Sequence, residues 1–315
     1  QDTSFLKNEI MRLKKEKDVV ILAHNYEIPD VQDVADFTGD SLGLSKLAAT
    51  VQQKTILFCG VHFMAETAAI ISPEKRVLLP SLEAGCSLSD SITADELRNW
   101  KKQHPDAISV GYVNTTAEIK SELDYCCTSS NAVNVVNSIP KDKEILFLPD
   151  MFLGSYVAKM TGRNNMHIWA GECHVHAGIT PEDVTKKLNS MHDTEFLIHP
   201  ECSCTTPMMY DVADGSYENN KVSILSTEGM LNYASASKSK NFVVATETGI
   251  LYKMKKDNPD KTFVPASEKA ECQYMKMITL EKVHDALVRE KNVITVPKKI
   301  ADKARLAINR MLEIS

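Results

Sequence analysis

The chain has 315 residues, of which 43% are hydrophobic and 25% are charged. These proportions are typical of a globular protein and exclude a fibrous or disordered chain. Its 36 basic and 42 acidic residues give a net charge of −6, and the basic residues form no stripe, so we expect no nucleic-acid partner. No apolar run approaches the roughly 20 residues that cross a bilayer, and the first residues lack a signal-peptide core, so we expect a cytoplasmic protein without a membrane partner.

The cysteines are few and unevenly spaced, which excludes the disulfide framework of a small secreted domain. In a reducing compartment we expect all of them to be free thiols or metal ligands. A chain of this length buries enough surface to fold without a metal, so any bound metal would serve chemistry. The eight cysteines are Cys59, Cys86, Cys126, Cys127, Cys173, Cys202, Cys204 and Cys272.

After a predicted helix over residues 4–17, a pattern of strands and helices occurs three times along the chain. Each repeat opens with an apolar run that ends in polar residues, at 19–26, 108–114 and 196–201. Hydroxyl-rich turns then precede a helix, at 39–42, 128–131 and 225–229. A second strand follows, at 55–58, 144–147 and 241–245, and a third at 76–79, 166–169 and 261–264. An insertion near residues 211–220 lengthens the third repeat, and a final helix is expected over residues 298–313.

Alternating strands and helices of this kind require small parallel sheets that are covered by helices on both faces. We therefore predict an α/β fold of three similar αβα domains around a pseudo-threefold axis. The predicted domains are residues 1–98, residues 99–187 and residues 188–315, the last of which includes the C-terminal helix.

One cysteine follows the third strand of each repeat, namely Cys86, Cys173 and Cys272. Ligands of parallel sheets bind beyond the carboxyl ends of the strands, so a threefold arrangement would bring these three sulfurs together. Three thiolates can hold an iron–sulfur cluster and leave one iron free to bind a substrate. Zinc binding and plain burial of the thiols remain alternatives at this point.

The other cysteines are weaker candidates as ligands, and we expect them in the core or in loops. The spacing of Cys202 and Cys204 fits no common zinc motif. His174 and His176 directly follow Cys173, and we expect them to support the site rather than to bind the metal.

Polar side chains stand two residues apart at the end of the first strand of each repeat. Residues at this spacing point to the same side of a strand, so each pair would face a shared cavity, although capping of a sheet edge is the simpler role for any one of them. Imidazole, phenol and carboxyl groups are the usual carriers of protons in catalysis. The three pairs are His24 with Tyr26, Tyr112 with Asn114, and His199 with Glu201.

Four hydroxyl residues stand where helices are expected to begin. Helix N-termini bind anions through free N–H groups and the helix dipole, but an ordinary N-cap explains each hydroxyl equally well. These residues are Ser41, Ser129, Ser226 and Thr227. The sequence has no Walker loop, dinucleotide glycine fingerprint or nucleophile elbow, which disfavours nucleotide-binding and serine-hydrolase functions.

Together these segments resemble the quinolinate synthase family over nearly the whole chain. The motifs that carry the resemblance are Ile21-Leu22-Ala23-His24-Asn25-Tyr26, Gly39-Asp40-Ser41-Leu42, Phe63-Met64-Ala65-Glu66, Tyr112-Val113-Asn114, Cys127-Thr128-Ser129, residues 169–176, His199-Pro200-Glu201 and Ser226-Thr227-Glu228-Gly229.

The resemblance implies one [4Fe-4S] cluster per chain, held by Cys86, Cys173 and Cys272. It also implies condensation of iminoaspartate with dihydroxyacetone phosphate to quinolinate, phosphate and water in the de novo route to NAD. L-aspartate oxidase or aspartate dehydrogenase would supply the iminoaspartate.

The resemblance further assigns roles to individual residues. Tyr26, Glu201, His199 and Tyr112 would be catalytic, with Tyr26 and Glu201 as the acid and base. The residues implied to contact substrate are His24, Ser41, Tyr112, Asn114, Ser129, His199, Glu201, Ser226 and Thr227.

The chain departs from the family at its last ligand. Cys272 stands alone, whereas some members carry a Cys-x-x-Cys-x-x-Cys run there, so disulfide control through such a run is not expected. Two alternatives stay open. One is a three-cysteine [4Fe-4S] enzyme of reductive or radical chemistry, such as hydroxymethylbutenyl diphosphate reductase or the diphthamide-forming enzymes, and the other is an iron–sulfur sensor.

Overall fold

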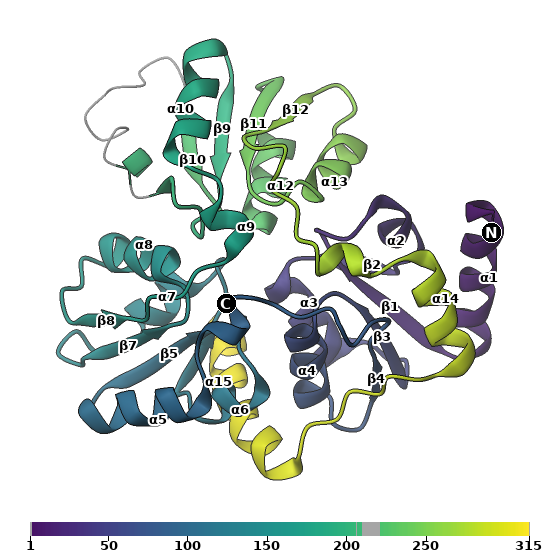
Figure 1. Cartoon of the computed structure of the whole chain (residues 1–315), viewed down its shortest axis with the longest axis horizontal. Helices are drawn as coiled ribbons and strands as arrows, with labels where there is room; N and C mark the ends of the chain where they lie inside the picture. The colour runs from purple at the N-terminus through teal and green to yellow at the C-terminus, as the bar shows by residue number, and fades with distance from the viewer. Residues whose placement is uncertain (1, 206, 210–220, 315) are drawn as a thin grey trace.

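The computed structural model describes residues 2–205, 207–209 and 221–314, which form three lobes around a common centre (Figure 1). Within these residues the strands make three four-stranded sheets, and every pair of neighbouring strands is parallel. The strand orders are β2-β1-β3-β4, β6-β5-β7-β8 and β10-β9-β11-β12, so the three sheets share one topology. The predicted α/β fold of three similar αβα units is confirmed.

The first unit begins with helix α1, whose N-cap is the Asp2 side chain. All residues of β1 are buried, because this strand lies inside its sheet and is covered on both faces. The elements of the unit are α1 (Thr3–Glu16), β1 (Val19–His24), α2 (Pro29–Val34), β2 (Phe37–Gly39), α3 (Ser41–Thr50), β3 (Thr55–Cys59), α4 (His62–Ile71), β4 (Arg76–Leu78) and the short helix η1 (Ser89–Ser91).

The second unit follows the same order of strands. Gly111 of β5 allows the close approach of Leu123, because a Cβ atom at this glycine would overlap the Leu123 side chain. The elements are α5 (Ala94–Gln103), β5 (Ile108–Tyr112), α6 (Ala117–Ser121), β6 (Tyr125–Cys127), α7 (Ala132–Asn137), β7 (Ile145–Leu148), α8 (Met151–Thr161), β8 (Met166–Ile168) and α9 (His174–Ala177).

The third unit has its own cluster of buried apolar side chains, which includes Val184, Phe196 and Val243. Its elements are α10 (Pro181–Ser190), β9 (Glu195–Ile198), β10 (Val222–Ile224), α12 (Thr227–Ala236), β11 (Asn241–Ala245), α13 (Ile250–Asp257), β12 (Thr262–Pro265) and the short helix η2 (Met275–Met277). The expected insertion at residues 211–220 lies outside the described residues.

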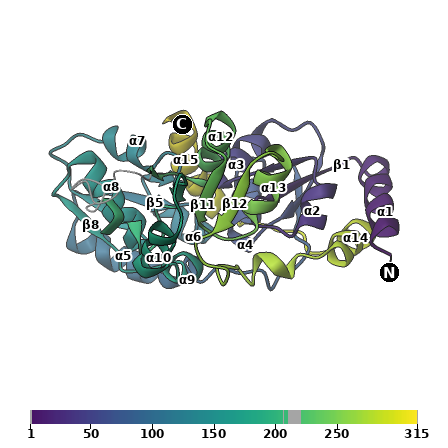
Figure 2. The ribbon, with the colours of Figure 1, turned by 90° about the horizontal axis from the view of Figure 1, so that it is seen from above.

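The chain after η2 leaves the third unit and packs on the other two. Helix α14 (Leu280–Arg289) contacts α1 and β3, and the two helices lie side by side at one end of the molecule (Figure 2). Val293 then forms a bridge with Leu78 of β4. The predicted C-terminal helix is confirmed as α15 (Lys298–Ile314), which packs against α6 and β6 of the second unit and α4 of the first. This tail therefore ties the three units together.

The sequence did not reveal the fourth strand of each sheet, namely β2, β6 and β10, because each has three residues and runs directly into a hydroxyl-rich turn. The predicted domain boundaries after residues 98 and 187 fall inside α5 and α10, the helices that precede the first strand of the next sheet. Among the described helices, none is both long and apolar enough to cross a membrane.

Candidate active site

A single cavity lies where the three units meet, and residues from all three line it. Many of them stand at the carboxyl ends of the central strands, where parallel sheets bind their ligands. The lining residues are His24, Tyr26, Asp40, Ser41, Val61, Phe63, Met64, Gly85, Cys86, Tyr112, Asn114, Thr128, Ser129, Cys173, Val175, His176, His199, Glu201, Thr227, Glu247, Cys272 and Met275.

The structure brings all but one of the predicted catalytic, substrate-binding and metal-binding residues to this cavity. The exception is Ser226, which is the N-cap of α12 and whose Oγ accepts a 3.1 Å hydrogen bond from the Gly229 N–H. Ser41 and Thr227 are the first residues of α3 and α12, so their helix N-termini face the cavity as expected. Asp40, rather than a hydroxyl, caps α3.

His24 and His199 are oriented in the same way in two different units. The Tyr26 N–H donates to His24 Nδ1 over 3.1 Å, and the Glu201 N–H donates to His199 Nδ1 over 3.2 Å. A ring whose Nδ1 accepts a hydrogen bond carries its proton on Nε2 when it is neutral. Burial lowers the pKa of His24 to about 3 and that of His199 well below its usual value, so both rings are neutral near pH 7.

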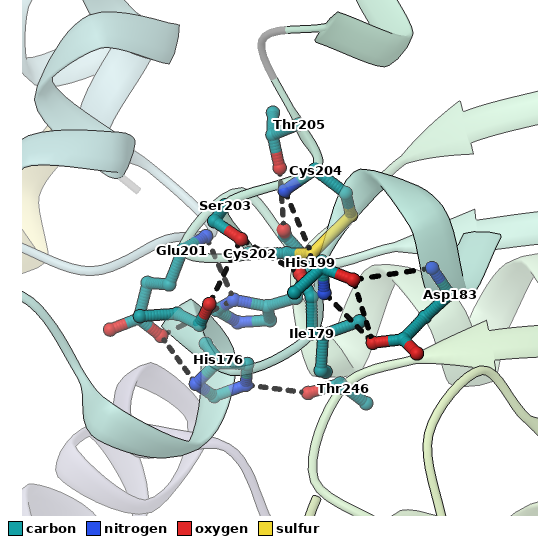
Figure 3. Close-up of a disulfide and its surroundings, with 12 residues drawn as sticks. His176, Ile179, Asp183, His199, Glu201, Cys202, Ser203, Cys204, Thr205 and Thr246 are labelled. Carbon is teal, nitrogen blue, oxygen red and sulfur yellow. Dashed lines mark hydrogen bonds and ion pairs between the residues drawn. A yellow bond between two sulfur atoms is a disulfide. The ribbon is translucent and has the colours of Figure 1, made fainter. Parts of the chain in front are cut away.

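Glu201 is a buried carboxyl group between two imidazoles. Its Oε2 lies 3.2 Å from His199 Nδ1 and 3.6 Å from His176 Nδ1, while Oε1 has no hydrogen-bond partner (Figure 3). Burial, with repulsion from Asp150, raises the pKa of Glu201 well above its usual value. This shift favours the protonated carboxyl group, which is suited to act as a general acid.

A chain of polar groups connects a cysteine of the second unit to Tyr26 of the first. His176 Nδ1 lies 3.3 Å from the Cys173 sulfur, and His176 Nε2 lies 2.8 Å from Thr246 Oγ1. The Tyr26 hydroxyl is 2.6 Å from that same oxygen. Burial raises the pKa of Tyr26 well above its usual value, so the phenol keeps its proton. This arrangement can move a proton between the cavity and the neighbourhood of Cys173.

Cys86, Cys173 and Cys272 occupy equivalent places in the three units. Each is followed by a short helical turn, and the backbone N–H groups two and three residues further on approach its sulfur. These N–H groups stabilise a thiolate, but burial dominates and raises the pKa of Cys86 to about 12, with Cys173 and Cys272 also raised. A bound cation is what would make all three sulfurs thiolates.

The spacing of the sulfurs bears on which metal fits. One tetrahedral zinc ion holds sulfurs about 2.3 Å away, which places them roughly 4 Å apart. Among the described residues, the groups of three ligand atoms that lie within 4.8 Å of one another are His104–Glu144–His167 and His176–His199–Glu201, neither of which contains a cysteine. The sulfurs of Cys86, Cys173 and Cys272 are therefore not all within 4.8 Å of one another, a spacing wider than a single zinc ion requires.

Two buried acids support the cysteine loops and were not singled out in the sequence. Asp150 stands two residues after β7, and Glu247 stands two residues after β11, the equivalent strand of the third sheet. Glu247 accepts a 3.1 Å hydrogen bond from the Cys272 N–H. Burial raises the pKa of Asp150 to about 7, and the N–H groups of Leu153 and Cys173 partly offset this rise. Their matched position after equivalent strands, 23 and 25 residues before a cysteine, was the available sequence signal.

The expectation that every cysteine is a free thiol or a ligand is wrong for one pair. Cys202 and Cys204 form a disulfide directly beside Glu201 (Figure 3). The chain turns sharply after β9 and brings the two Cα atoms to 5.3 Å, which is within the usual range for a disulfide. The expected burial of the remaining cysteines holds, since Cys59, Cys126 and Cys127 are free and buried.

Comparisons with known proteins agree on one family. Residues 8–313 match the family model described as quinolinate synthetase A protein. The chain is 52% identical over 309 residues to a quinolinate synthase of Thermus thermophilus, an alignment that covers 98% of this chain and 97% of that protein. It is 50% identical over 306 residues to the quinolinate synthases of Mycobacterium sp. strain KMS and of Mycobacterium tuberculosis, covering 97% of this chain and 91% and 88% of those proteins.

Proposed function

Because this chain belongs to the quinolinate synthase family of enzymes, we propose that it condenses iminoaspartate with dihydroxyacetone phosphate to quinolinate, phosphate and water. The observation that carries the proposal is the cavity shared by three units, with one cysteine and one pair of polar strand-end groups from each. This activity would supply quinolinate for NAD synthesis.

Cys86, Cys173 and Cys272 would hold a [4Fe-4S] cluster. Their equivalent positions, their N–H contacts and the wide spacing of their sulfurs support this assignment. A cluster with three protein ligands supplies an iron that acts as a Lewis acid toward a substrate oxygen or nitrogen.

The first task of the protein groups is to bind two anionic substrates. The N-termini of α3 and α12 present Ser41 and Thr227 to the cavity, and both positions favour carboxylate or phosphate oxygens. The Nε2–H groups of His24 and His199 add donors that are neutral before binding. Because both imidazoles are neutral, an incoming anion would raise their pKa values and draw in protons.

Proton transfer is the second task. The enamine carbon of iminoaspartate displaces phosphate, the triose part isomerises from ketose to aldose, the amine closes the ring, and water leaves. Each step moves a proton to or from carbon, oxygen or nitrogen. Glu201, whose protonated form burial favours, can give a proton, and Tyr26 can exchange one with His176 through Thr246.

Exclusion of water is the third task. Tyr26, Tyr112, His24, His199 and Glu201 are all buried, although they line the cavity. A dry cavity protects the imine from hydrolysis and strengthens each polar contact. We also propose a cytoplasmic location, since six of the eight cysteines are free thiols, although Cys202 and Cys204 form a disulfide.

The test is an assay of the anaerobically prepared, cluster-loaded protein with iminoaspartate and dihydroxyacetone phosphate. The proposal predicts quinolinate among the products and one phosphate released per quinolinate formed. Substrate that remains unconsumed would favour a sensor or a reductive enzyme with the same cysteine arrangement.

A further inference from the structure

We propose that His104, Glu144 and His167 form a binding site for one zinc ion on the second unit, separate from the active site. The three residues come from different elements. His104 follows α5, Glu144 directly precedes β7, and His167 is the central residue of the edge strand β8.

The ligand atoms of the three side chains converge on one point. His104 Nδ1 lies 2.6 Å from Glu144 Oε1, and His167 Nε2 contacts the same carboxylate oxygen. All three atoms lie within 4.8 Å of one another. Two imidazoles and a carboxylate are a common ligand set for zinc, which accepts water at its remaining position. The side chains are 24%, 36% and 43% exposed, so an ion and its water can reach them.

The backbone fixes this convergence before any ion binds. His167 is in register with Leu146, and Glu144 stands two residues before Leu146, so the side chains of Glu144 and His167 leave the same face of the sheet. The ring of His104, just after α5, packs at a tilt of 37° against that of His167, with 4.3 Å between their centroids.

A pair of tryptophans next to the site holds α5 and β8 together. Trp100 lies one helical turn before His104, and Trp169 lies two residues after His167. The two indole rings are 5.5 Å apart, and the Trp169 Nε1–H donates to the Ser91 backbone oxygen over 3.1 Å. This packing limits the freedom of both histidines, so less conformational entropy is lost when an ion binds.

The other two units show that the fold does not require these residues. The residue before the strand that corresponds to β7 is Lys54 in the first unit and Lys240 in the third. The position that corresponds to His167 is Val77 in the first unit and Phe263 in the third. Only the second sheet of the described residues therefore places three ligand groups at this edge.

The proposed zinc site and the cavity lined by the three cysteines lie at opposite ends of the strands. Glu144 stands at the amino end of β7, whereas the active-site cavity lies beyond the carboxyl ends of the strands. Zinc at this place would have no access to the substrates, so we assign it to stabilising the contact between α5 and the edge strand β8.

The test uses the cluster-loaded enzyme, so that the cysteines are occupied. We expect equilibrium dialysis to show one tightly bound Zn²⁺ or Co²⁺ per chain. The affinity should fall at least tenfold in Glu144→Gln and in His167→Gln. A matched control is His192→Gln, because His192 lies between α10 and β9 as His104 lies between α5 and β5, and this variant should bind as the wild type does.

Two readouts locate the ion. Bound Co²⁺ should quench the fluorescence of Trp100 and Trp169, the only tryptophans of the chain, and should lack the strong absorption that thiolate ligands give. Zn²⁺ should raise the melting temperature of the wild type but not that of Glu144→Gln or His104→Gln. Equal binding by wild type and triad variants, or a thiolate spectrum for Co²⁺, would overturn the proposal.

Discussion

The buried carboxylate of Glu247 accepts a 3.1 Å hydrogen bond from the backbone N–H of Cys272. It also accepts one from the Gly249 N–H over 2.9 Å and forms a 2.9 Å ion pair with Lys276. The Lys276 ammonium in turn donates to the Tyr26 backbone oxygen over 2.5 Å. Glu247 thereby fixes the position of a cysteine from the third unit relative to a tyrosine from the first.

We predict that Glu247→Gln weakens this link without unfolding the protein. The amide can keep one hydrogen bond, but Lys276 loses its partner, and we expect a loss of about 1–3 kcal/mol in the free energy of unfolding. Iron release from the cluster-loaded variant in air should be several times faster than from the wild type. Glu195→Gln is the control, because Glu195 accepts hydrogen bonds from Tyr233 and Ser237 away from the cavity. Equal release from both variants would contradict a positioning role.

Replacement of any one of Cys86, Cys173 and Cys272 by alanine should abolish the brown colour and the activity while the protein stays folded. The reason is that the three units have apolar cores that do not depend on a metal. Cys127→Ala is the matched control, since Cys127 is a free, buried cysteine that does not line the cavity. Full iron content in a variant would remove that cysteine from the set of ligands.

Glu201→Gln should bind both substrates but react slowly. The neutral amide has the shape of the protonated carboxyl group, which burial favours, but it cannot release a proton. We expect kcat to fall about 10²- to 10⁴-fold with a change in KM of only a few fold. A steady-state comparison with the wild type measures both constants, and unchanged turnover would exclude Glu201 as the acid.

The contribution of His24 to the free energy of unfolding should decrease as the pH falls below about 6.5. Burial lowers the pKa of His24 from 6.5 to about 3, so the unfolded chain takes up a proton in this range that the folded chain does not. One such imidazole lowers the free energy of unfolding by about 2 kcal/mol between pH 7 and pH 5, and the loss continues as the pH falls toward 3. Urea unfolding at both pH values should show a smaller loss for His24→Gln than for the wild type. Identical losses would mean that His24 ionises freely in the folded state.

The long, buried elements of the fold could be predicted from the sequence, because β1, β3, β7 and β11 are apolar runs between clear turn signals. The edge strands β2, β6 and β10 could not, because each runs directly into a hydroxyl-rich turn, whereas the equally short β4 and β8 belong to apolar runs. The matched positions of Asp150 and Glu247 after equivalent strands do not by themselves distinguish buried acids that support a loop from exposed ones. That distinction depends on packing between units, which only the three-dimensional arrangement reveals.

The Cys202–Cys204 disulfide shows a similar limit. Its two cysteines match no ligand spacing, and their pairing depends on the turn after β9 rather than on a motif. By contrast, the three cavity cysteines could be found because each follows the same strand of a repeated unit.

Above all, we propose that three thiolates from three units hold a cluster that leaves one iron open to the substrate. Mössbauer spectroscopy of the anaerobically prepared enzyme, with and without added quinolinate, tests it most directly. We predict the signal of a [4Fe-4S] cluster in which a single iron changes its parameters when quinolinate binds. A cluster whose irons all keep the same parameters, or a protein that holds zinc at these cysteines in place of iron, would contradict the account.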